Sequence, residues 1–237
     1  MLEVYALSDP GCVRKNNEDC YLVDTDLGLY LLADGMGGAE AGELASRLAV
    51  DAVARYMRET GERSVEALVL AFEEANRQVL EYAESHPTLR GMGTTLVGVL
   101  ECGEYLAIAS VGDSRVYLYE SGSLAVITED HTWAHEVGRR LGLDSTKLRT
   151  HQLRHVLTMA VGVQSPLRIN SYAVTPAPGV QFLLCSDGLH GVVPFEVISE
   201  GLSYGQSLGA KCHYLIEQAR KAGGPDNITA VLLRHAG

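Results

Sequence analysis

The sequence predicts an α+β fold, a four-layer α-β-β-α sandwich in which two antiparallel sheets pack face to face and helix pairs flank them. Short apolar runs are joined by turn residues with no helix between them, which indicates antiparallel hairpins instead of parallel β-α-β units. Two pairs of segments have apolar residues at helical spacing. Neither a linker nor an internal repeat divides the 237 residues. We therefore expect one domain that spans residues 1–237.

The first part of the chain is expected to alternate from strands to helices. Residues 2–8, 20–23 and 29–33 are apolar runs bounded by turn-forming residues, which predicts three strands. Apolar residues then recur at helical spacing over residues 43–58. Ser64 is placed to cap a second amphipathic helix. Both helices are amphipathic, and a coiled dimer seam is the alternative use of their apolar faces. Because neither helix runs beyond a few turns, we expect both to pack on the protein's own sheet.

The second part of the chain is expected to supply most of the remaining strands. These are residues 94–101, 105–111, 116–120, 124–128, 169–174, 181–185 and 228–234. A less regular stretch covers residues 131–162. Pro194 opens a short helix, and a longer helix covers residues 206–222 until Gly223-Gly224-Pro225 stops it.

The charge balance excludes some partners. Lys and Arg total 19 against 30 Asp and Glu, a net charge of −11, so neither nucleic acid nor an anionic membrane surface is expected as a partner. The acidic excess serves either solubility or the gathering of carboxylates around cations. No window approaches about 18 uninterrupted apolar residues, and the first residues lack a basic segment followed by an apolar one. We expect a cytoplasmic monomer.

The five cysteines do not define a site. Their number is odd and no C-x-x-C pair occurs, so neither a disulfide scaffold nor a zinc ribbon is expected. No cysteine is followed six positions later by arginine, which excludes the C-x5-R nucleophile loop of tyrosine phosphatases. We expect reduced thiols in a cytosolic protein.

A group of aspartates shares one sequence context. Asp34, Asp113, Asp187 and Asp226 stand beside glycine or turn residues at the ends of apolar runs, and Asp19 joins them from a charged segment. A carboxylate at the end of a buried strand is costly unless it is paired or bound to a cation. The strand ends of a sandwich gather at one rim, where like charges repel without a counter-cation. A single aspartate of this kind is usually a turn former, but four in one antiparallel domain favour a cation site.

The residue types indicate which metal ions and which chemical group of a substrate the site suits. Carboxylate-rich, all-oxygen sites suit Mg²⁺, Mn²⁺ or Ca²⁺ and not structural zinc. Gly35 can offer its backbone carbonyl, because no side chain blocks the approach. Two ions about 3.5–4 Å apart, bridged by a carboxylate, can activate a water for in-line attack on phosphorus. The planar fork of Arg14 suits the oxygens of a phosphate.

Seven short motifs resemble, in their order, those of one family. They are Arg-x-x-Asn-Glu-Asp (14–19), Ala-Asp-Gly-Met-Gly-Gly (33–38), Gly-Met-Gly-Thr-Thr (91–95), Val-Gly-Asp-Ser-Arg (111–115), Thr-Glu-Asp-His-Thr (128–132), Cys-Ser-Asp-Gly-Leu (185–189) and Gly-Pro-Asp-Asn-Ile-Thr (224–229). The chain resembles the PPM family, the Mg²⁺/Mn²⁺-dependent protein serine/threonine phosphatases of type 2C, in their compact bacterial form. The resemblance covers nearly the whole chain and implies a β-sandwich with the metals at one end.

The resemblance implies a role for each residue of the central acidic group. Asp34 would bridge two Mn²⁺ or Mg²⁺ ions. Gly35 would bind one ion through its carbonyl, and Asp187 and Asp226 would hold the other. A water activated by this metal pair would attack the phosphate of phosphoserine or phosphothreonine in a protein.

The resemblance also implies roles for residues around this group. Asp19, alone or with Glu18, would act through metal-bound waters, and Asp113 would help to bind a third, looser ion. Arg14 would hold the substrate phosphate. Residues 133–154 would form a variable flap that influences substrate choice. The expected partners are phosphorylated proteins, the targets of a serine/threonine kinase.

Two positions depart from the family pattern. Relatives often have histidine after the glycine pair or two residues after the bridging aspartate, whereas this chain has Ala39 and Met36 at these positions. We therefore expect a metal-bound water to protonate the leaving group. Two further functions stay open, hydrolysis of a small phosphate ester and an inactive scaffold. The intact Asp34 and Arg14 oppose the scaffold.

The histidines provide a second metal hypothesis. His131 and His135, and likewise His151 and His155, are four positions apart, which on a helix would place each pair on one face and allow zinc binding. Surface positions in loops or in the flap are the preferred interpretation. His190 follows one of the strand-end aspartates closely and could act as an acid.

Overall fold

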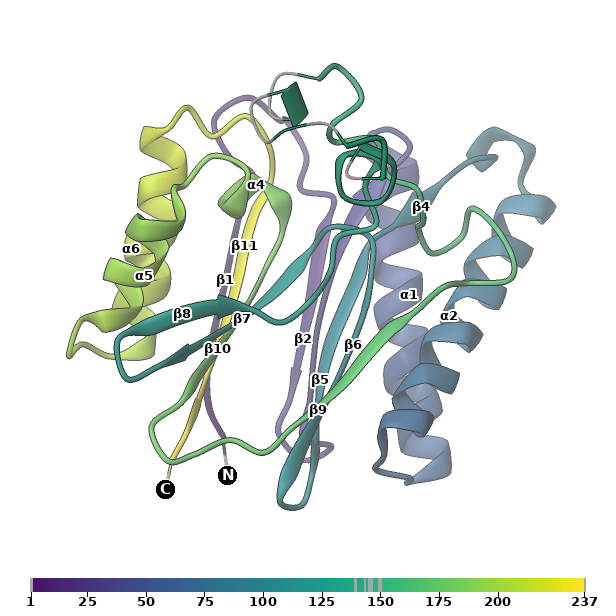
Figure 1. Cartoon of the computed structure of the whole chain (residues 1–237). Coiled ribbons are helices and arrows are strands. Elements are labelled where there is room, and N and C mark those ends of the chain that lie inside the picture. Colours follow the sequence, from purple (N-terminus) through teal and green to yellow (C-terminus); the bar gives the residue numbers. More distant parts are fainter. Residues whose placement is uncertain (1, 139, 143, 145–146, 149–150, 237) are drawn as a thin grey trace.

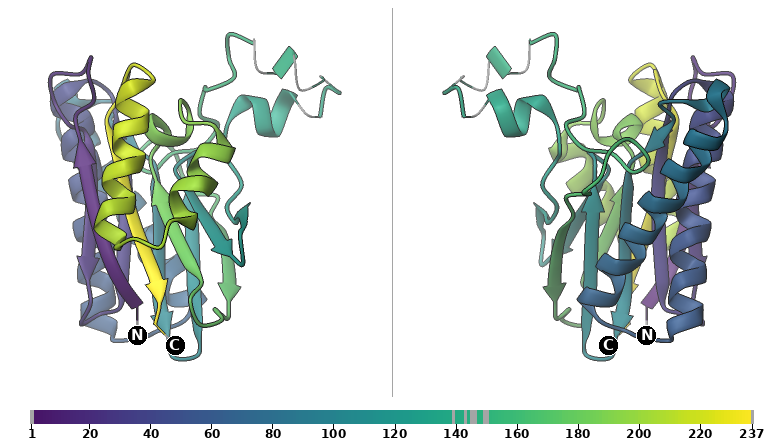
Figure 2. Two further views of the ribbon diagram at one scale, coloured as in Figure 1. Left: turned by 90° about the vertical axis from the view of Figure 1, so that its left-hand side faces the viewer. Right: turned by 90° about the vertical axis from the view of Figure 1, so that its right-hand side faces the viewer.

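Two antiparallel sheets form the centre of the molecule, and helices cover both outer faces (Figure 1). The structure is a computed structural model that describes residues 2–138, 140–142, 144, 147–148 and 151–236. The two side views each look onto one outer face and show helices lying in front of the strands (Figure 2). The predicted four-layer α-β-β-α sandwich is therefore confirmed.

The first sheet brings the two ends of the chain together. Its strands lie in the order β1 (Leu2–Asp9), β11 (Ile228–His235), β10 (Gln181–Cys185), β7 (Arg115–Glu120) and β8 (Ser123–Val126). All neighbouring strands in it are antiparallel. The last strand of the chain thus pairs with both β1 and β10. This pairing brings the segment that precedes β2 close to the segment that follows β10.

The second sheet contains the strands that carry the opening motifs. Its order is β2 (Asp19–Asp24), β3 (Leu29–Met36), β5 (Leu96–Cys102), β6 (Tyr105–Val111) and β9 (Asn170–Val174), and the two-residue strand β4 (Gly93–Thr94) pairs with the end of β3. These pairs are also antiparallel. The hairpins β2–β3, β5–β6 and β7–β8 match the prediction. The short turn over residues 112–114 was also expected to close a hairpin, and this is wrong, because it carries the chain from β6 in the second sheet to β7 in the first.

Helices cover each sheet in a pair. The helices α1 (Ala39–Thr60) and α2 (Val65–Ser85) pack on the second sheet, and α5 (Phe195–Ser203) and α6 (Leu208–Lys221) pack on the first. Three short pieces complete the described helices, namely η1 (Pro87–Leu89), η2 (Ala134–Gly138) and the one-turn α4 (Asp187–His190). The Ser64 hydroxyl accepts a hydrogen bond from the Ala67 N–H at 3.0 Å, as expected for the cap of α2.

Apolar side chains fill the space on both faces of each sheet. One cluster lies between the sheets and includes Leu32, Ile108 and Phe182. The other two lie under the helix pairs, where Phe72 packs against the second sheet and Leu215 against the first. Because central strands bury both faces, they read as continuous apolar runs instead of alternating patterns.

Three elements differ from the prediction near the aspartates. β3 does not end at Ala33 but continues to Met36, because its last residues pair with β4. α1 begins at Ala39 instead of at Glu43. The helix α4, which starts at Asp187, was not predicted, because four residues are too few to show helical periodicity.

One rim of the sandwich gathers the ends of β3, β6 and β10. This is the upper rim in Figure 1, and both chain ends lie at the opposite rim. Described residues of the segment between β8 and β9 extend beyond the upper rim (Figure 2). Among the described residues, no helix combines the length and the apolar character that crossing a membrane requires.

Gly35 marks the contact between α1 and β3. A methyl group on Gly35 would lie 2.1 Å from the carbonyl oxygen of Gly42 and 2.7 Å from that of Glu18. These are backbone atoms that cannot turn away, so only glycine permits this approach. The expected reason for glycine here was access to its carbonyl, and helix packing is an additional reason.

We expect Gly35→Ala to lower the free energy of unfolding by about 1–3 kcal/mol, because the added methyl group pushes α1 away from β3. Denaturant unfolding in the presence of a chelator measures this effect without a contribution from bound metal. Gly205→Ala is the matched control, since a methyl group there meets no atom within 4 Å. Equal stability of Gly35→Ala and the wild-type protein would contradict the packing argument.

Candidate functional site

The five predicted aspartates come together at the upper rim from separate elements. Asp34 lies near the end of β3, directly opposite Asp19 at the start of β2. Asp113 lies in the turn between β6 and β7, and Asp187 is the first residue of α4. Asp226 precedes β11. The expectation that strand ends would gather these carboxylates at one rim is therefore confirmed.

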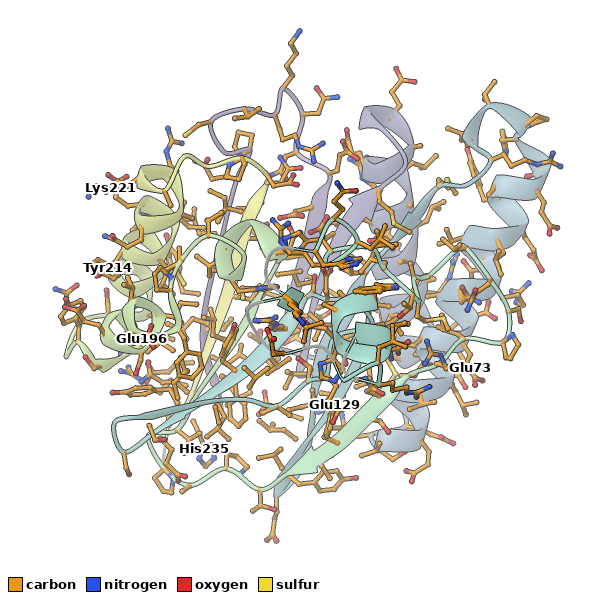
Figure 3. All side chains as sticks on the ribbon, turned by 45° about the horizontal axis from the view of Figure 1, so that its top comes forward. Glu73, Glu129, Glu196, Tyr214, Lys221 and His235 are labelled. Carbon is orange, nitrogen blue, oxygen red and sulfur yellow. The ribbon has the colours of Figure 1, made fainter. Side chains whose placement is uncertain are left out.

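A cleft with a volume of about 480 Å³ opens among these residues. In Figure 3, which turns the rim toward the viewer, Lys221 on α6 and Glu73 on α2 mark opposite edges of the molecule, and the rim lies between them. The residues that line the cleft include Arg14, Glu18, Asp34, Gly35, Asp113, Asp187 and Asp226. The cleft therefore collects the predicted phosphate and metal residues, and Asp19 adjoins it through its pairing with Asp34.

Hydroxyl groups fix the backbone at Asp34. Its N–H donates to Thr95 Oγ1 at 3.0 Å, and its carbonyl accepts from Thr94 Oγ1 at 2.8 Å. Thr95 Oγ1 also lies 2.7 Å from the hydroxyl of Ser114, the residue after Asp113. Buried hydroxyl groups thus connect the segments that carry two of the aspartates, which fixes their separation.

Asp19 has one bonded and one unbonded oxygen. Its Oδ2 accepts from Ser186 Oγ at 2.8 Å and from Thr229 Oγ1 at 2.6 Å. Its Oδ1 is buried and has no hydrogen-bond partner. A buried carboxylate oxygen left in this state costs free energy, so it fits a site for a cation or for a water held by a cation.

Burial and like charge raise the pKa of the carboxyl groups. Burial raises the pKa of Asp34 well above its usual value, and the charges of Asp19 and Asp187 add to this effect. Burial raises the pKa of Asp19 to about 7. Burial together with the Asp187 charge raises the pKa of Asp113 to about 8. Carboxyl groups with raised pKa values retain protons near neutral pH, and divalent cations can replace these protons.

The aspartates do not form a complete metal cage by themselves. Over the part of the chain that the structure describes, no three His, Cys, Asp or Glu side chains are arranged to hold an ion. This agrees with the chemistry of Mg²⁺, which keeps several waters and binds through one or two carboxylates. The donor set of carboxylates and backbone carbonyls fits hard cations that are partly coordinated by water.

Arg14 lies at the edge of the cleft in the loop between β1 and β2. Its Nη2 donates to Asp226 Oδ2 at 2.8 Å, and this hydrogen bond raises the pKa of Arg14. Its side chain is 49 % exposed, and exposed ion pairs contribute only about 0–1 kcal/mol. The guanidinium can therefore exchange Asp226 for another anion at small cost.

A second hollow, of about 470 Å³, adjoins the cleft and shares Asp113, His155 and Asp187 with it. His190 lines this hollow, and its Nε2–H donates to the carbonyl oxygen of Asp113 at 2.9 Å. Burial lowers the pKa of His190 to about 4, so the imidazole is neutral. His190 thus holds the Asp113 turn, and this arrangement speaks against the role of acid that its sequence position suggested.

The histidine pairs lack the surroundings of a zinc site, since no cluster of three metal-binding side chains occurs among the described residues. His131 is only 4 % exposed, and its Nδ1 accepts from the Gly112 N–H at 3.2 Å. The preferred interpretation of His131 as a surface residue is therefore wrong, because the turn after β6 covers it. The His151 ring stacks on Trp133, with the ring centroids 4.0 Å apart.

The predicted flap is described only in part. Residues 139, 143, 145–146 and 149–150 of the segment 133–154 lie outside the described residues. Four described residues of the segment line the second hollow, namely Ala134, His135, Leu148 and Arg154. The segment is thus placed beside the candidate site, as expected.

The supporting hydroxyl groups were not predicted from the sequence. Ser186 and Thr229 stand in the same motifs as Asp187 and Asp226, and Thr95 ends the motif Gly-Met-Gly-Thr-Thr, which contains no aspartate. A sequence signal was therefore present for Ser186 and Thr229. Serine and threonine beside glycine and aspartate are also common in ordinary turns, so the pattern alone does not indicate a supporting role.

The raised carboxyl pKa values predict how the stability of the metal-free protein depends on pH. The folded pKa values of Asp19 and Asp113, about 7 and about 8, exceed the unfolded value of about 3.9. The folded state then binds more protons than the unfolded state in this range, so stability falls as the pH rises. We expect Tm in EDTA to fall by about 5 °C or more between about pH 5 and about pH 8.5.

Thermal unfolding with and without Mn²⁺ measures this dependence. Mn²⁺ should raise Tm most at the alkaline end of the range, where the carboxylates are ionised and repel one another. A Tm in EDTA that stays constant or rises over this pH range would contradict the presence of buried carboxylates that repel one another.

Comparison with known proteins relates the chain to one family. The sequence model of the protein phosphatase 2C family matches residues 14–232. The serine/threonine phosphatase stp of Listeria monocytogenes serovar 1/2a is 35 % identical over 234 residues, which are 95 % of this chain and 93 % of that protein. The serine/threonine protein phosphatase PstP of Mycobacterium tuberculosis is 37 % identical over 236 residues, which are 98 % of this chain and 45 % of that protein.

Solved structures agree with this relationship. The structure of Mycobacterium tuberculosis PstP has a TM-score of 0.89 at 36 % identity and covers 100 % of this chain and 99 % of that chain. The Streptococcus agalactiae serine/threonine phosphatase has a TM-score of 0.92 at 29 % identity, with 99 % and 100 % covered. A PstP catalytic domain in complex with two manganese ions has a TM-score of 0.86 at 34 % identity, with 100 % and 99 % covered. The chain therefore belongs to the protein phosphatase 2C family and is a protein phosphatase enzyme.

Proposed function

We propose that this chain hydrolyses phosphoserine and phosphothreonine in proteins, with Mn²⁺ or Mg²⁺ as its cofactor. One observation carries the proposal: four aspartates and Arg14 from separate elements line one cleft and a fifth aspartate, Asp19, adjoins it, so that the carboxylates repel one another unless cations are bound. The relatives are named serine/threonine phosphatases, which supports the substrate class. The PstP domain with two manganese ions supports the cofactor.

Some of the proposed ligands would bind the ions directly, and one would bind through water. The two core ions would be held by Asp34, the backbone carbonyl of Gly35, Asp187 and Asp226. We assign the shared position to Asp34, because it is the most central carboxylate and feels the charge of the four others. Asp19 would act through water, for which its unpaired Oδ1 is available. Asp113 would hold a third, looser ion together with Asp187.

The residues of the chain supply phosphate binding and orientation. When bound, the ions provide a water of lowered pKa and positive charge against the phosphate oxygens. Arg14 binds the phosphate by exchanging its weak pair with Asp226 for two oxygens of the substrate. The Nε2–H of His190 is already donated to a carbonyl, so the proton for the leaving oxygen comes from water in the open cleft.

The shape of the site favours phosphoproteins over small esters. The second hollow continues from the cleft and offers room for side chains that flank the phosphorylated residue. A small ester would leave this hollow unused. We therefore propose as substrates the targets of a serine/threonine kinase, acted on by a cytoplasmic, single-domain monomer.

Turnover of a phosphothreonine peptide tests the proposal. We expect activity with Mn²⁺, its loss in EDTA, and a decrease of more than about a hundredfold in Asp34→Asn. Asp51→Asn is the matched control, because Asp51 is an exposed aspartate on α1. Activity that persists in EDTA, or that is equal in Asp34→Asn and the wild-type protein, would contradict the proposal.

Two further measurements separate the alternatives. Faster turnover of a small ester such as p-nitrophenyl phosphate than of any phosphopeptide, compared by kcat/KM, would favour the small-ester function. Tight Mn²⁺ binding without turnover of either substrate would favour the scaffold. The proposed function requires a higher kcat/KM for the peptide.

A further inference from the structure

The side chain of Asn227 closes the loop that carries Arg14. Asn227 follows Asp226 and is only 4 % exposed. Its Oδ1 accepts a hydrogen bond from the Glu18 N–H at 2.8 Å. Its Nδ2 donates to the carbonyl of Asn16 at 2.8 Å and to that of Pro10 at 3.1 Å. One amide group therefore holds both ends of the loop over residues 10–18.

The middle of this loop depends on such anchors. Residues 12–16, which include Arg14, are exposed, whereas Glu18 is buried. A backbone hydrogen bond from the Cys12 N–H to the Gly224 carbonyl, 2.8 Å long, is a further attachment to the segment before β11. An exposed loop keeps a defined shape only when buried contacts fix its ends. The position of Arg14 over the cleft thus follows from contacts made at residues 224–227.

The chemistry at this position requires an amide. An amide side chain has one acceptor oxygen and an NH₂ group with two donors, and Asn227 uses the oxygen and both donors. A carboxylate would lose both donations and add charge beside Asp226. An apolar side chain would leave the buried Glu18 N–H and the carbonyls of Asn16 and Pro10 without this partner.

We propose that Asn227 is a positioning residue that holds Arg14 in place for phosphate binding and connects the loop over residues 10–18 to the segment of Asp226. This inference rests on the proposed function for its substrate, but the binding of inorganic phosphate tests it independently of turnover. Asn227 borders the cleft, but its side-chain oxygen and its NH₂ group are already bonded to the loop, so this assignment gives it no contact with phosphate or metal. It acts through the shape of the loop.

Removal of the amide should weaken phosphate binding selectively. In Asn227→Ala we expect KM for a phosphothreonine peptide and the dissociation constant for inorganic phosphate to rise about tenfold. We expect kcat to change less than about threefold, and the Mn²⁺ affinity measured by calorimetry to stay unchanged. In an Arg14→Ala background, Asn227→Ala should have no further effect on phosphate binding, because the residue through which it acts is absent.

A second buried asparagine provides the control. Asn76 is also 4 % exposed and bonds two backbone groups, the Gly162 N–H at 2.8 Å and the Gln164 carbonyl at 3.0 Å. It lies on α2, so Asn76→Ala should reduce Tm without raising the phosphate dissociation constant. If Asn227→Ala does not fold, Asn227→Ser is the second variant, with the same expected direction.

Two results would overturn the proposal. One is a lower Mn²⁺ affinity of Asn227→Ala with unchanged phosphate binding, since Asn227 would then position Asp226 instead of Arg14. The other is an effect on phosphate binding of equal size with and without Arg14. Failure of the proposed function gives a different result, because the wild-type protein would then hydrolyse no phosphopeptide. The binding of inorganic phosphate to the wild-type protein and to Asn227→Ala could still be compared in that case.

Discussion

Repulsion among buried carboxylates is the constraint on which the rest of this structure depends. Burial raises the pKa of Asp34, and the charges of Asp19, Asp187, Asp113 and Asp226 raise it further. Stability alone does not favour such an arrangement, because each ionised group loses solvation and meets like charge. Protons relieve the repulsion in the metal-free chain, and the proposed divalent cations relieve it in the working enzyme. The hydroxyl and amide groups around the aspartates keep the carboxylates in place in either case.

Close backbone contacts hold the segments of the site together. A methyl group on Gly188 would lie 1.9 Å from the carbonyl oxygen of Asn227, so α4 and the start of β11 are in direct contact. The contact of Gly35 with Gly42 joins β3 to α1 in the same way. The glycines beside the aspartates therefore do more than reverse the chain. They allow segments from both sheets to meet within reach of one cleft, where metal and phosphate groups must act together.

Much of this arrangement could be predicted from the sequence, because local patterns determine it. Apolar runs and turn residues predicted both sheets, and aspartates at strand ends predicted the rim. Contacts between distant segments were not predictable. β3 extends past Asp34 only because β4, about 60 positions later, pairs with it. The hydrogen bonds of Asn227 join it to backbone groups more than 200 positions earlier, and the burial of His131 depends on the turn after β6. No local pattern carries that information.

Counting the Mn²⁺ ions bound per chain tests the carboxylate site most directly. The protein is freed of metal with a chelator, titrated with Mn²⁺ in a calorimeter at neutral pH, and the bound metal is measured independently by elemental analysis after gel filtration. A carboxylate group built around Asp34 predicts two tightly bound ions per chain, with a third only at higher Mn²⁺ concentration. Absence of binding, or a single ion that remains bound equally well when Asp34 is replaced by Asn, would contradict a two-metal centre at this rim.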